Sequence, residues 1–292
     1  MDLYLFAAPF SAIPTFAAGL FGLLIGSFLN VVIHRMPKML EREFENACAE
    51  HAGHEPVHTD TYTLAVPRSA CPHCGHKITA LENVPVLSYL VLRGKCRGCQ
   101  AKISPIYPAI ELLSGLTAAW MVWQFGSGWA GLGAAVFGLM LIAMTFIDLE
   151  TQYLPDDLTL PLMWLGLLIN LNATFASLRD AVIGAVAGYL VLWSVNALFK
   201  LVRKIDGMGG GDFKLLAALG AWMGWQMLPA IILLSSVVGA VVGISLILFK
   251  GNGRDTRIPF GPYLAGAGVL ALLFGPQITM LMGFYLHPGQ PL

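Results

Sequence analysis

The chain has 292 residues, of which 57% are hydrophobic and only 12% are charged. Because that charged share is about half the usual share for a soluble domain, the composition argues against a water-soluble enzyme and excludes a disordered chain. Seventeen basic residues balance seventeen acidic ones, so net charge indicates no nucleic-acid partner, and none is expected.

Eight apolar segments recur along the chain, and most approach the length of about 17–25 residues that a helix needs to cross a bilayer. The first runs from about residue 11 to 33. It is too long for the core of a signal peptide and no Lys or Arg precedes it, so we expect a retained span. A polar stretch, 34–104, separates it from the other seven, which lie near 106–124, 130–148, 158–174, 181–199, 213–228, 229–249 and 260–286. The sequence therefore predicts an all-α polytopic membrane protein with about eight transmembrane helices.

Basic residues orient these spans, because loops rich in Lys and Arg stay in the cytoplasm. Sixteen of the 17 basic residues lie in 34–105, 200–214 and 250–257, and only Arg179 lies elsewhere. Placing these three connections in the cytoplasm puts both termini on the outer side. The segment 213–228 is short and contains Lys214, but without it the last basic connection would lie outside.

The predicted organisation has three parts. An N-terminal transmembrane span occupies 1–33, a small cytoplasmic domain 34–105, and a seven-span domain 106–292. Three of the spans each contain a pair of glycines four residues apart: Gly22 and Gly26, Gly184 and Gly188, and Gly239 and Gly243. That spacing lets helix backbones approach closely in lipid, so we expect a packed bundle. No internal repeat is evident.

Four of the five cysteines form two pairs with the spacing of a metal site. Cys71 with Cys74, and Cys96 with Cys99, make two C-x2-C units separated by 21 residues. Each unit can place two thiolates on one ion, and together they complete a tetrahedral zinc site. Four free or oxidised cysteines are the alternative, although cytoplasmic thiols usually stay reduced. Since four thiolates leave no position for substrate, we expect a structural Zn²⁺ that stabilises the 34–105 domain.

Other potential ligands match a metal site less well. His73 and His76 could replace a thiolate, and Cys48 stands alone with no expected role in metal binding. The segment 54–58, His-Glu-Pro-Val-His, matches the H-E-x-x-H pattern of zinc peptidases, which works only on a helix. Pro56 inside the motif is badly tolerated by a helix, so we expect a solvated loop.

Two carboxylates stand out, because charges inside a bilayer are costly and usually functional. Asp148 ends the segment 130–148 and Asp212 precedes 213–228, so both are expected at the cytoplasmic edge. Two close carboxylates can share one proton: the ionised one takes a proton from water, and the protonated one polarises a peptide carbonyl. This aspartic-peptidase chemistry makes Asp148 and Asp212 the candidate catalytic pair. As alternatives, Asp212 only caps the helix that follows, and Asp148 only marks the membrane boundary.

Other polar groups lie beside these segments. Glu111, about a turn and a half inside the second span, is a candidate polar contact of the site. Lys214 is expected to extend to the interface or to tune Asp212. Asp156 and Asp157 are expected to cap the helix of the fourth segment.

Six motifs are spread over nearly the whole chain: Gly26-Ser-Phe-Leu-Asn30-Val-Val-Ile-His34-Arg35, the two cysteine pairs, Tyr107-Pro-Ala-Ile-Glu111-Leu-Leu, Phe146-Ile-Asp148, Leu154-Pro-Asp156 and Gly209-Gly-Gly211-Asp212-Phe-Lys214. With these motifs the chain resembles the bacterial type IV prepilin peptidases, the bifunctional leader peptidase/N-methyltransferases. The resemblance implies that Asp148 and Asp212 are the catalytic aspartates of 106–292. The acidic, His-rich stretch 41–63 matches no motif.

The resemblance also implies the function. Such an enzyme lies in the bacterial inner membrane and serves a type IV pilus or type II secretion system. There, the orientation expected from the basic residues places both termini in the periplasm. It cleaves the leader of prepilins or pseudoprepilins after a glycine at the cytoplasmic face. It then methylates the new N-terminal residue with S-adenosylmethionine, for which no binding residues are predicted. The alternatives are a peptidase without methyltransferase activity, or a polytopic transporter with a zinc-binding cytoplasmic module.

Overall fold

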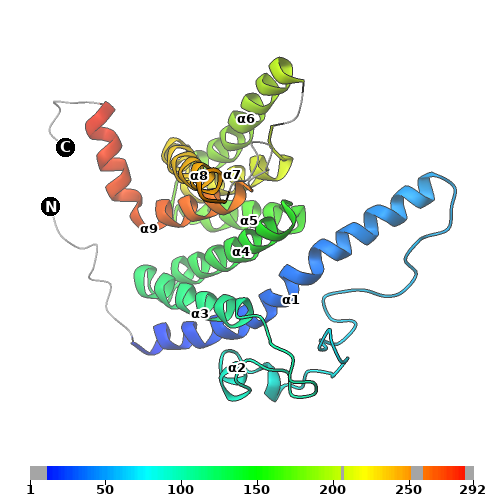
Figure 1. Ribbon diagram of the computed structural model, residues 1–292. Coiled ribbons are helices and arrows are strands. Elements are labelled where there is room, and N and C mark those ends of the chain that lie inside the picture. Colours follow the sequence, from blue (N-terminus) through cyan, green and yellow to red (C-terminus); the bar gives the residue numbers. More distant parts are fainter. Residues whose placement is uncertain (1–11, 205–206, 251–258, 287–292) are drawn as a thin grey trace. The chain divides into compact units, whose positions relative to one another are not determined.

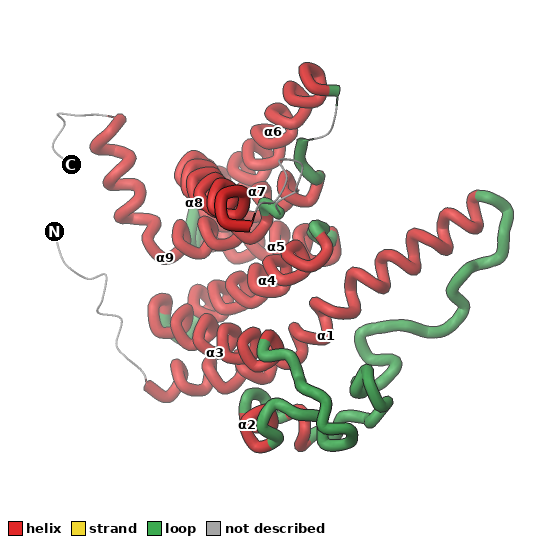
Figure 2. Tube along the Cα trace, in the orientation of Figure 1, coloured by secondary structure: helices red, strands yellow, loops and turns green. Residues whose placement is uncertain are grey.

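The computed structural model describes residues 12–204, 207–250 and 259–286 (Figure 1). Throughout these residues the regular structure is helical, and Figure 2 shows helices joined by loops without a strand. The α-helices are α1 (Ala12–His51), α2 (Leu87–Val91), α3 (Ile106–Phe125), α4 (Trp129–Thr151), α5 (Asp156–Ile169), α6 (Leu178–Arg203), α7 (Gly210–Met223), α8 (Leu228–Lys250) and α9 (Gly261–Leu286). Short 3-10 helices are η2 (Leu81–Asn83), η3 (Asn170–Asn172) and η4 (Trp225–Met227).

Six helical segments among the described residues are long and apolar enough to cross a membrane: Ala12–His51, Ile106–Phe125, Trp129–Thr151, Leu178–Arg203, Trp225–Leu246 and Gly261–Leu281. Two of the eight predicted segments instead form the 14-residue helices α5 and α7. Each is about 21 Å long, shorter than the hydrocarbon core of about 30 Å. The start of the first predicted span at Ser11 and the basic residues Arg254 and Arg257 lie outside the described residues.

The chain divides into two compact units, Met1–Ala143 and Met144–Leu292, and α4 runs from the first into the second. In the first unit α1 lies along α3 (Figure 1). An ideal Cβ on Gly22 would lie 2.7 Å from the Ala118 Cβ, and one on Gly26 would lie 2.8 Å from the Glu111 Cα. Because only glycine permits this approach, the predicted role of the first glycine pair is confirmed.

Helix α1 extends well beyond the predicted span. It has 40 residues and is about 60 Å long, so it continues through Pro37 to His51 instead of ending near residue 33. The segment that follows returns along this extension, because Asn46 and His58 exchange two hydrogen bonds of 2.9 and 2.8 Å. Arg42 also pairs with Asp60 at 2.9 Å. The acidic, His-rich stretch therefore forms a helical arm with a loop folded back on it.

The H-E-x-x-H segment lies in this returning loop, outside any helix, as the sequence predicts. Its two histidines are thus not brought together on one helix face. The Nε2 of His58 instead pairs with the carboxylate of Glu45 at 2.5 Å. A zinc-peptidase site at this segment is excluded by that geometry.

In the second unit, α7 is enclosed by α5, α6 and α9, and nearly all its residues are buried. An ideal Cβ on Gly184 of α6 would lie 2.4 Å from the carbonyl oxygen of Gly220, and one on Gly188 would lie 2.6 Å from that of Leu216. This glycine pair therefore sets α6 directly against α7, as predicted. An ideal Cβ on Gly239 of the third pair would lie 3.2 Å from the ring of Tyr263.

Hydrogen bonds fix α5 to the far end of α7. The indole N–H of Trp222 donates to the carbonyl oxygen of Leu162 at 2.8 Å. The side-chain amide of Asn170 donates to the carbonyl oxygens of Ala221 and Trp222, both at 2.9 Å. The two Asn170 bonds satisfy carbonyl groups that a helix leaves free at its C-terminus. Helix α7 is therefore held at this end, while Asp212 lies at the other.

Candidate active site and metal centre

Both predicted catalytic carboxylates lie in the second unit, and both are buried. Asp148 is in the last turn of α4 with 4% of its surface exposed, and Asp212 is in the first turn of α7 with 9% exposed. The two side chains are close enough to repel each other electrostatically. The N-cap of α7 is Gly209, so the alternative that Asp212 serves as the helix cap is wrong. The structure thus gathers at one place the two acids that the sequence predicts to act together.

Asp148 is held by the beginning of α9. The backbone N–H of Gly261 donates to its Oδ2 at 3.0 Å. An ideal Cβ on Gly261 would lie only 2.6 Å from that same oxygen, so this contact requires a glycine. Sequence reasoning missed this residue. Its signal is a Gly-Pro step, Gly261-Pro262, directly before an apolar run, which is typical of a helix start.

Leu154 forms an apolar wall between the two helix starts. It is buried in the connection from α4 to α5. An ideal Cβ on Gly211 would lie 2.6 Å from the Leu154 Cβ, and one on Gly261 would lie 3.1 Å from its Cδ1. The glycine directly before Asp212, Gly211 in the motif Gly209-Gly-Gly211-Asp212, is thereby explained by the approach of Leu154 to the start of α7.

Lys214 does not bind Asp212 but pairs with Asp156. Its Nζ lies 2.6 Å from both carboxylate oxygens of Asp156, in the first turn of α5. The prediction that Asp156 and Asp157 cap this helix is wrong, because Pro155 occupies the N-cap position. The ion pair instead joins the starts of α5 and α7. Among the described residues the carboxylate of Asp212 accepts no hydrogen bond, while its backbone N–H donates to the carbonyl oxygen of Gly209.

The four paired cysteines meet as the sequence predicts. Their sulfur atoms all lie within 4.8 Å of one another, with Cys71 and Cys99 at 3.8 Å and Cys74 and Cys96 at 4.0 Å. A tetrahedral site with Zn–S bonds of about 2.3 Å has edges of about 3.8 Å. Disulfides are excluded at these separations, because a sulfur–sulfur bond is about 2.05 Å. The donor set fits a four-thiolate metal ion, and Cys48 lies apart on the arm of α1.

Backbone donors prepare one of these thiols for metal binding. The N–H groups of His73 and Cys74 lower the pKa of Cys71 to about 7. Because the thiolate is the form that binds metal, the backbone donors favour Cys71 as a ligand at neutral pH. Although a hydrogen bond from the backbone N–H of His76 acts to lower it, the pKa of Cys74 is raised to about 11 by desolvation and the neighbouring thiols. Neither His73 nor His76 belongs to the set of candidate ligands.

The two cysteine units are an internal repeat that the sequence prediction missed. Both read R-x-x-C-x-x-C-x-x-K-I-[ST], at 68–79 and 93–104. Equivalent hydrogen bonds recur: Cys71 N to His76 O matches Cys96 N to Ala101 O, and Ile78 N to Ser69 O matches Ile103 N to Gly94 O. Isolated bridges Ala70–Lys77 and Lys95–Lys102 also correspond. We call these the first and second knuckles.

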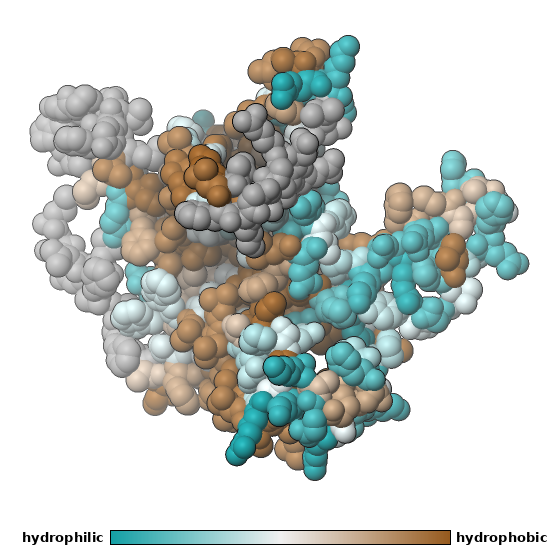
Figure 3. All heavy atoms as spheres, viewed as in Figure 1, coloured by the Kyte–Doolittle hydropathy of each residue, from teal (hydrophilic) through white to brown (hydrophobic). Residues whose placement is uncertain are grey.

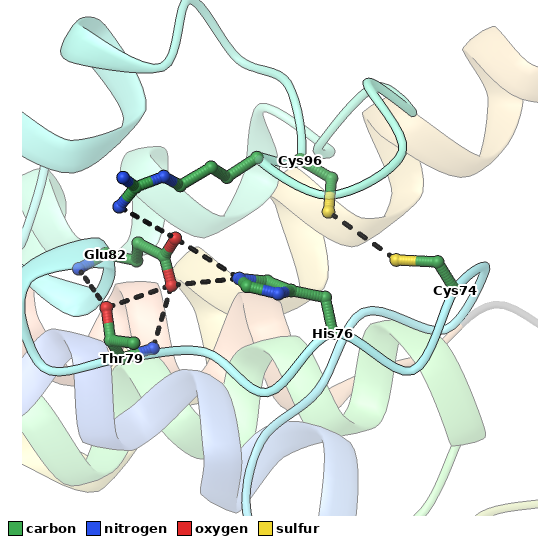
Figure 4. A network of polar contacts seen from close by, with 6 residues as sticks. Cys74, His76, Thr79, Glu82 and Cys96 are labelled. Carbon is green, nitrogen blue, oxygen red and sulfur yellow. Dashed lines mark hydrogen bonds and ion pairs between the residues drawn. The ribbon is translucent and has the colours of Figure 1, made fainter.

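An acidic residue between the knuckles ties them together (Figure 4). Glu82 accepts hydrogen bonds from the backbone N–H and the hydroxyl of Thr79, at 2.9 and 3.0 Å. It also contacts His76 at 3.2 Å and Arg97 at 3.7 Å. The Thr79 N–H, with the hydroxyl and His76, lowers the pKa of Glu82 to about 2. An ionised Glu82 thus contacts His76 and Thr79 of the first knuckle and Arg97 of the second.

Glu111 has a structural contact in the first unit. Its Oε2 accepts a hydrogen bond of 2.8 Å from the backbone N–H of Val86, just before α2. Val86 has φ 60° and ψ −46°, and Leu87 N bonds to Pro85 O, which is the rare and strained form of the γ-turn. Glu111 therefore fixes this turn to α3.

Comparisons with known proteins agree with these features. Residues 20–125 match the model of the bacterial peptidase A24 N-terminal domain, and residues 135–244 match that of the type IV leader peptidase family. The chain is 58% identical over 265 residues to the prepilin leader peptidase/N-methyltransferase of Aeromonas hydrophila, covering 89% of this chain and 90% of that protein. It is 54% identical over 261 residues to the protein of that name from Pseudomonas aeruginosa, covering 89% and 90%. It is 52% identical over 286 residues to the protein of that name from Burkholderia pseudomallei, covering 94% of this chain and 92% of that protein. No solved structure matches the chain.

Proposed function

The chain belongs to the type IV leader peptidase family, and from this premise we propose that Asp148 and Asp212 are the catalytic pair of a prepilin peptidase. The burial of two mutually repelling carboxylates at one site supports this assignment. One ionised carboxylate takes a proton from the attacking water, and the other, protonated, polarises the carbonyl of the scissile bond after a glycine. The reaction needs no metal, and its substrates are prepilins or pseudopilins.

The same chain, in this proposal, methylates the amine that cleavage exposes. The relatives carry both activities in their name and align with this chain over about nine-tenths of its length. S-adenosylmethionine is the methyl donor. The four thiolates hold a structural Zn²⁺, since they fill its tetrahedron and leave no position for a substrate.

Membrane topology completes the proposal. Eight spans cross the inner membrane, with a zinc-binding domain at 34–105, the peptidase domain at 106–292, and both termini in the periplasm. Excess positive charge supports this count, because the connections 200–214 and 250–257 both lie in the cytoplasm only if α5 and α7 also cross. The short α7 is enclosed by neighbouring helices, so it meets protein rather than lipid over most of its length.

The catalytic assignment is tested with Asp148→Asn and Asp212→Asn separately. We expect each variant to lose leader cleavage by at least about 1,000-fold, because each removes one ionisable member of the pair. The assay is mass spectrometry of a precursor pilin after incubation with purified protein in liposomes, which reports leader loss and methyl addition together. Asp157→Asn, an exposed carboxylate in the first turn of α5, is the matched control and should cleave normally.

Folding is checked in the same experiment with a pilin whose leader has already been removed. Both Asn variants should still methylate this substrate, since the pair acts only in cleavage. Full cleavage by either Asn variant would refute the pair. If the unaltered protein does not methylate this substrate, the protein is a peptidase without methyltransferase activity.

A further inference from the structure

An open, basic pocket lies at the second knuckle, immediately before α3. Its volume is about 400 Å³, and its lining includes Tyr89, Arg93, Lys95, Lys102, Ile103 and Ser104. Three lining residues are cationic, and none of the lining residues is acidic. The pocket is therefore electrostatically suited to an anion.

The pocket stands beside the end of a candidate membrane span. Lys102 is four residues before Ile106, where α3 begins. The Glu111–Val86 hydrogen bond also holds the start of α2 next to α3, at a level about 7.5 Å along that helix. In the proposed topology, where α3 crosses the membrane, this part of the unit lies at the depth where headgroups and acyl chains meet.

Helix α2 presents apolar side chains at that level. Leu87, Leu90 and Val91 are 61%, 64% and 80% exposed. Around the position that Figure 1 labels α2, Figure 3 shows strongly hydrophilic residues next to hydrophobic ones. A surface that combines exposed leucines with Lys and Arg is typical of segments that bind anionic membranes.

We propose that this pocket binds the phosphate headgroup of an anionic phospholipid, with the exposed residues of α2 against its acyl chains. Arg93, Lys95 and Lys102 neutralise the phosphate, and Tyr89 and Ser104 offer hydroxyl groups to it. S-adenosylmethionine fits this pocket poorly, because its sulfonium and ammonium groups give it a net positive charge. The basic leader of a prepilin is disfavoured for the same electrostatic reason.

The internal repeat supplies a matched control. Arg68 and Lys77 of the first knuckle occupy the repeat positions of Arg93 and Lys102 in the second. They have the same side chains and lie in the same kind of turn, yet the first knuckle does not line the pocket or lead into a span. Removing either pair changes the net charge of the chain equally.

The experiment is native mass spectrometry of the full-length, zinc-loaded protein with added phosphatidylglycerol or phosphatidylcholine. We expect the unaltered protein to retain phosphatidylglycerol preferentially. The double variant Arg93→Gln/Lys102→Gln should bind it about 30-fold more weakly, and Arg68→Gln/Lys77→Gln should bind it within about twofold of the unaltered protein. Zinc content near one ion per chain confirms that each variant is folded.

Further measurements separate the possible sources of the phosphate. Leu87→Ser/Leu90→Ser should also weaken phosphatidylglycerol binding, and inorganic phosphate or glycerol phosphate at the same concentration should not compete. Competition by either small phosphate would mean that the pocket binds a free phosphate rather than a lipid headgroup, and would overturn the proposal. Equal losses in the two charge variants, or no loss when Arg93 and Lys102 are changed, would overturn the proposal.

Discussion

Gly261 illustrates how a single missing side chain shapes the candidate active site. Its N–H holds one oxygen of Asp148, and its missing Cβ leaves the room that this oxygen occupies. Asp212 has no comparable support from the described residues, so the two acids differ in how firmly they are positioned. The geometry of the pair therefore depends on the start of α9 as well as on the helices that carry the acids.

We expect Gly261→Ala to reduce leader cleavage by at least about 100-fold. The added methyl would lie 2.6 Å from the Asp148 oxygen, so the carboxylate or the start of α9 must move. Cleavage is measured with a precursor pilin, and methylation of a pre-cleaved pilin should persist. Gly266→Ala, where nothing lies within 4 Å of the new Cβ, is the control in the same helix. Normal cleavage by Gly261→Ala would contradict the positioning role.

Single residues also show what sequence reasoning could reach. Asp148, Asp212 and the four cysteines were predictable, because charges in apolar segments and paired thiols are rare patterns that the chemistry explains. The contact of Gly261 was not, because its partner lies 113 residues away. The pairing of Lys214 with Asp156 likewise depends on how α5 and α7 pack.

At the scale of elements, the metal-binding knuckles are short turns that bury little apolar surface. Among the cysteines only Cys96 is buried, so a bound ion must supply much of the stability that a core would otherwise give. The repeat escaped the sequence prediction because only five of its twelve positions are identical and a sixth is conservative, Thr79 against Ser104. Its backbone hydrogen bonds reveal it.

We expect Cys74→Ser to lower the zinc content from about one ion per chain to below about 0.2, because a serine hydroxyl is a poor zinc ligand. Loss of the ion should speed amide hydrogen exchange throughout 68–104. Elemental analysis and hydrogen-exchange mass spectrometry measure the two effects. Cys48→Ser, which changes the cysteine on the arm of α1, is the control. Full zinc content in the Cys74 variant would show that another residue completes the site.

Helix packing in the second unit gives a second prediction at this scale. Gly188→Val should destabilise the protein by about 1–3 kcal/mol, since its side chain would collide with the backbone of α7 at Leu216. Thermal unfolding in detergent measures the loss, with Gly266→Ala again as the control. An unchanged midpoint would mean that α6 and α7 can separate at no cost.

For the whole molecule, the hydropathy pattern predicts most elements but not their lengths. Six apolar segments appear as helices long enough to cross a membrane. The arm of α1 was missed because its second half is polar, and polarity alone does not separate an exposed helix from a loop. The lengths of α5 and α7 were overestimated, because the predicted apolar segments also include the residues that follow each helix.

The eight-span topology is tested at Asn172, an exposed residue at the end of η3. Asn172→Cys should react with a membrane-impermeant maleimide in intact spheroplasts, because α5 crosses to the periplasmic side if there are eight spans. The native Cys48 should react only after permeabilisation, which makes it the internal control. Labelling of Asn172→Cys only in permeabilised cells would contradict a crossing by α5.

The duplicated knuckle has a consequence for assembly. A twelve-residue unit with two thiolates supplies only two of the four ligands of a tetrahedral ion. A chain with a single unit would therefore need the other two ligands from a second molecule. Here both halves share one polypeptide, and a tether of thirteen residues, 80–92, keeps them at a high effective concentration. Capture of the ion is thus an intramolecular event whose affinity does not depend on how many copies of the enzyme the membrane contains.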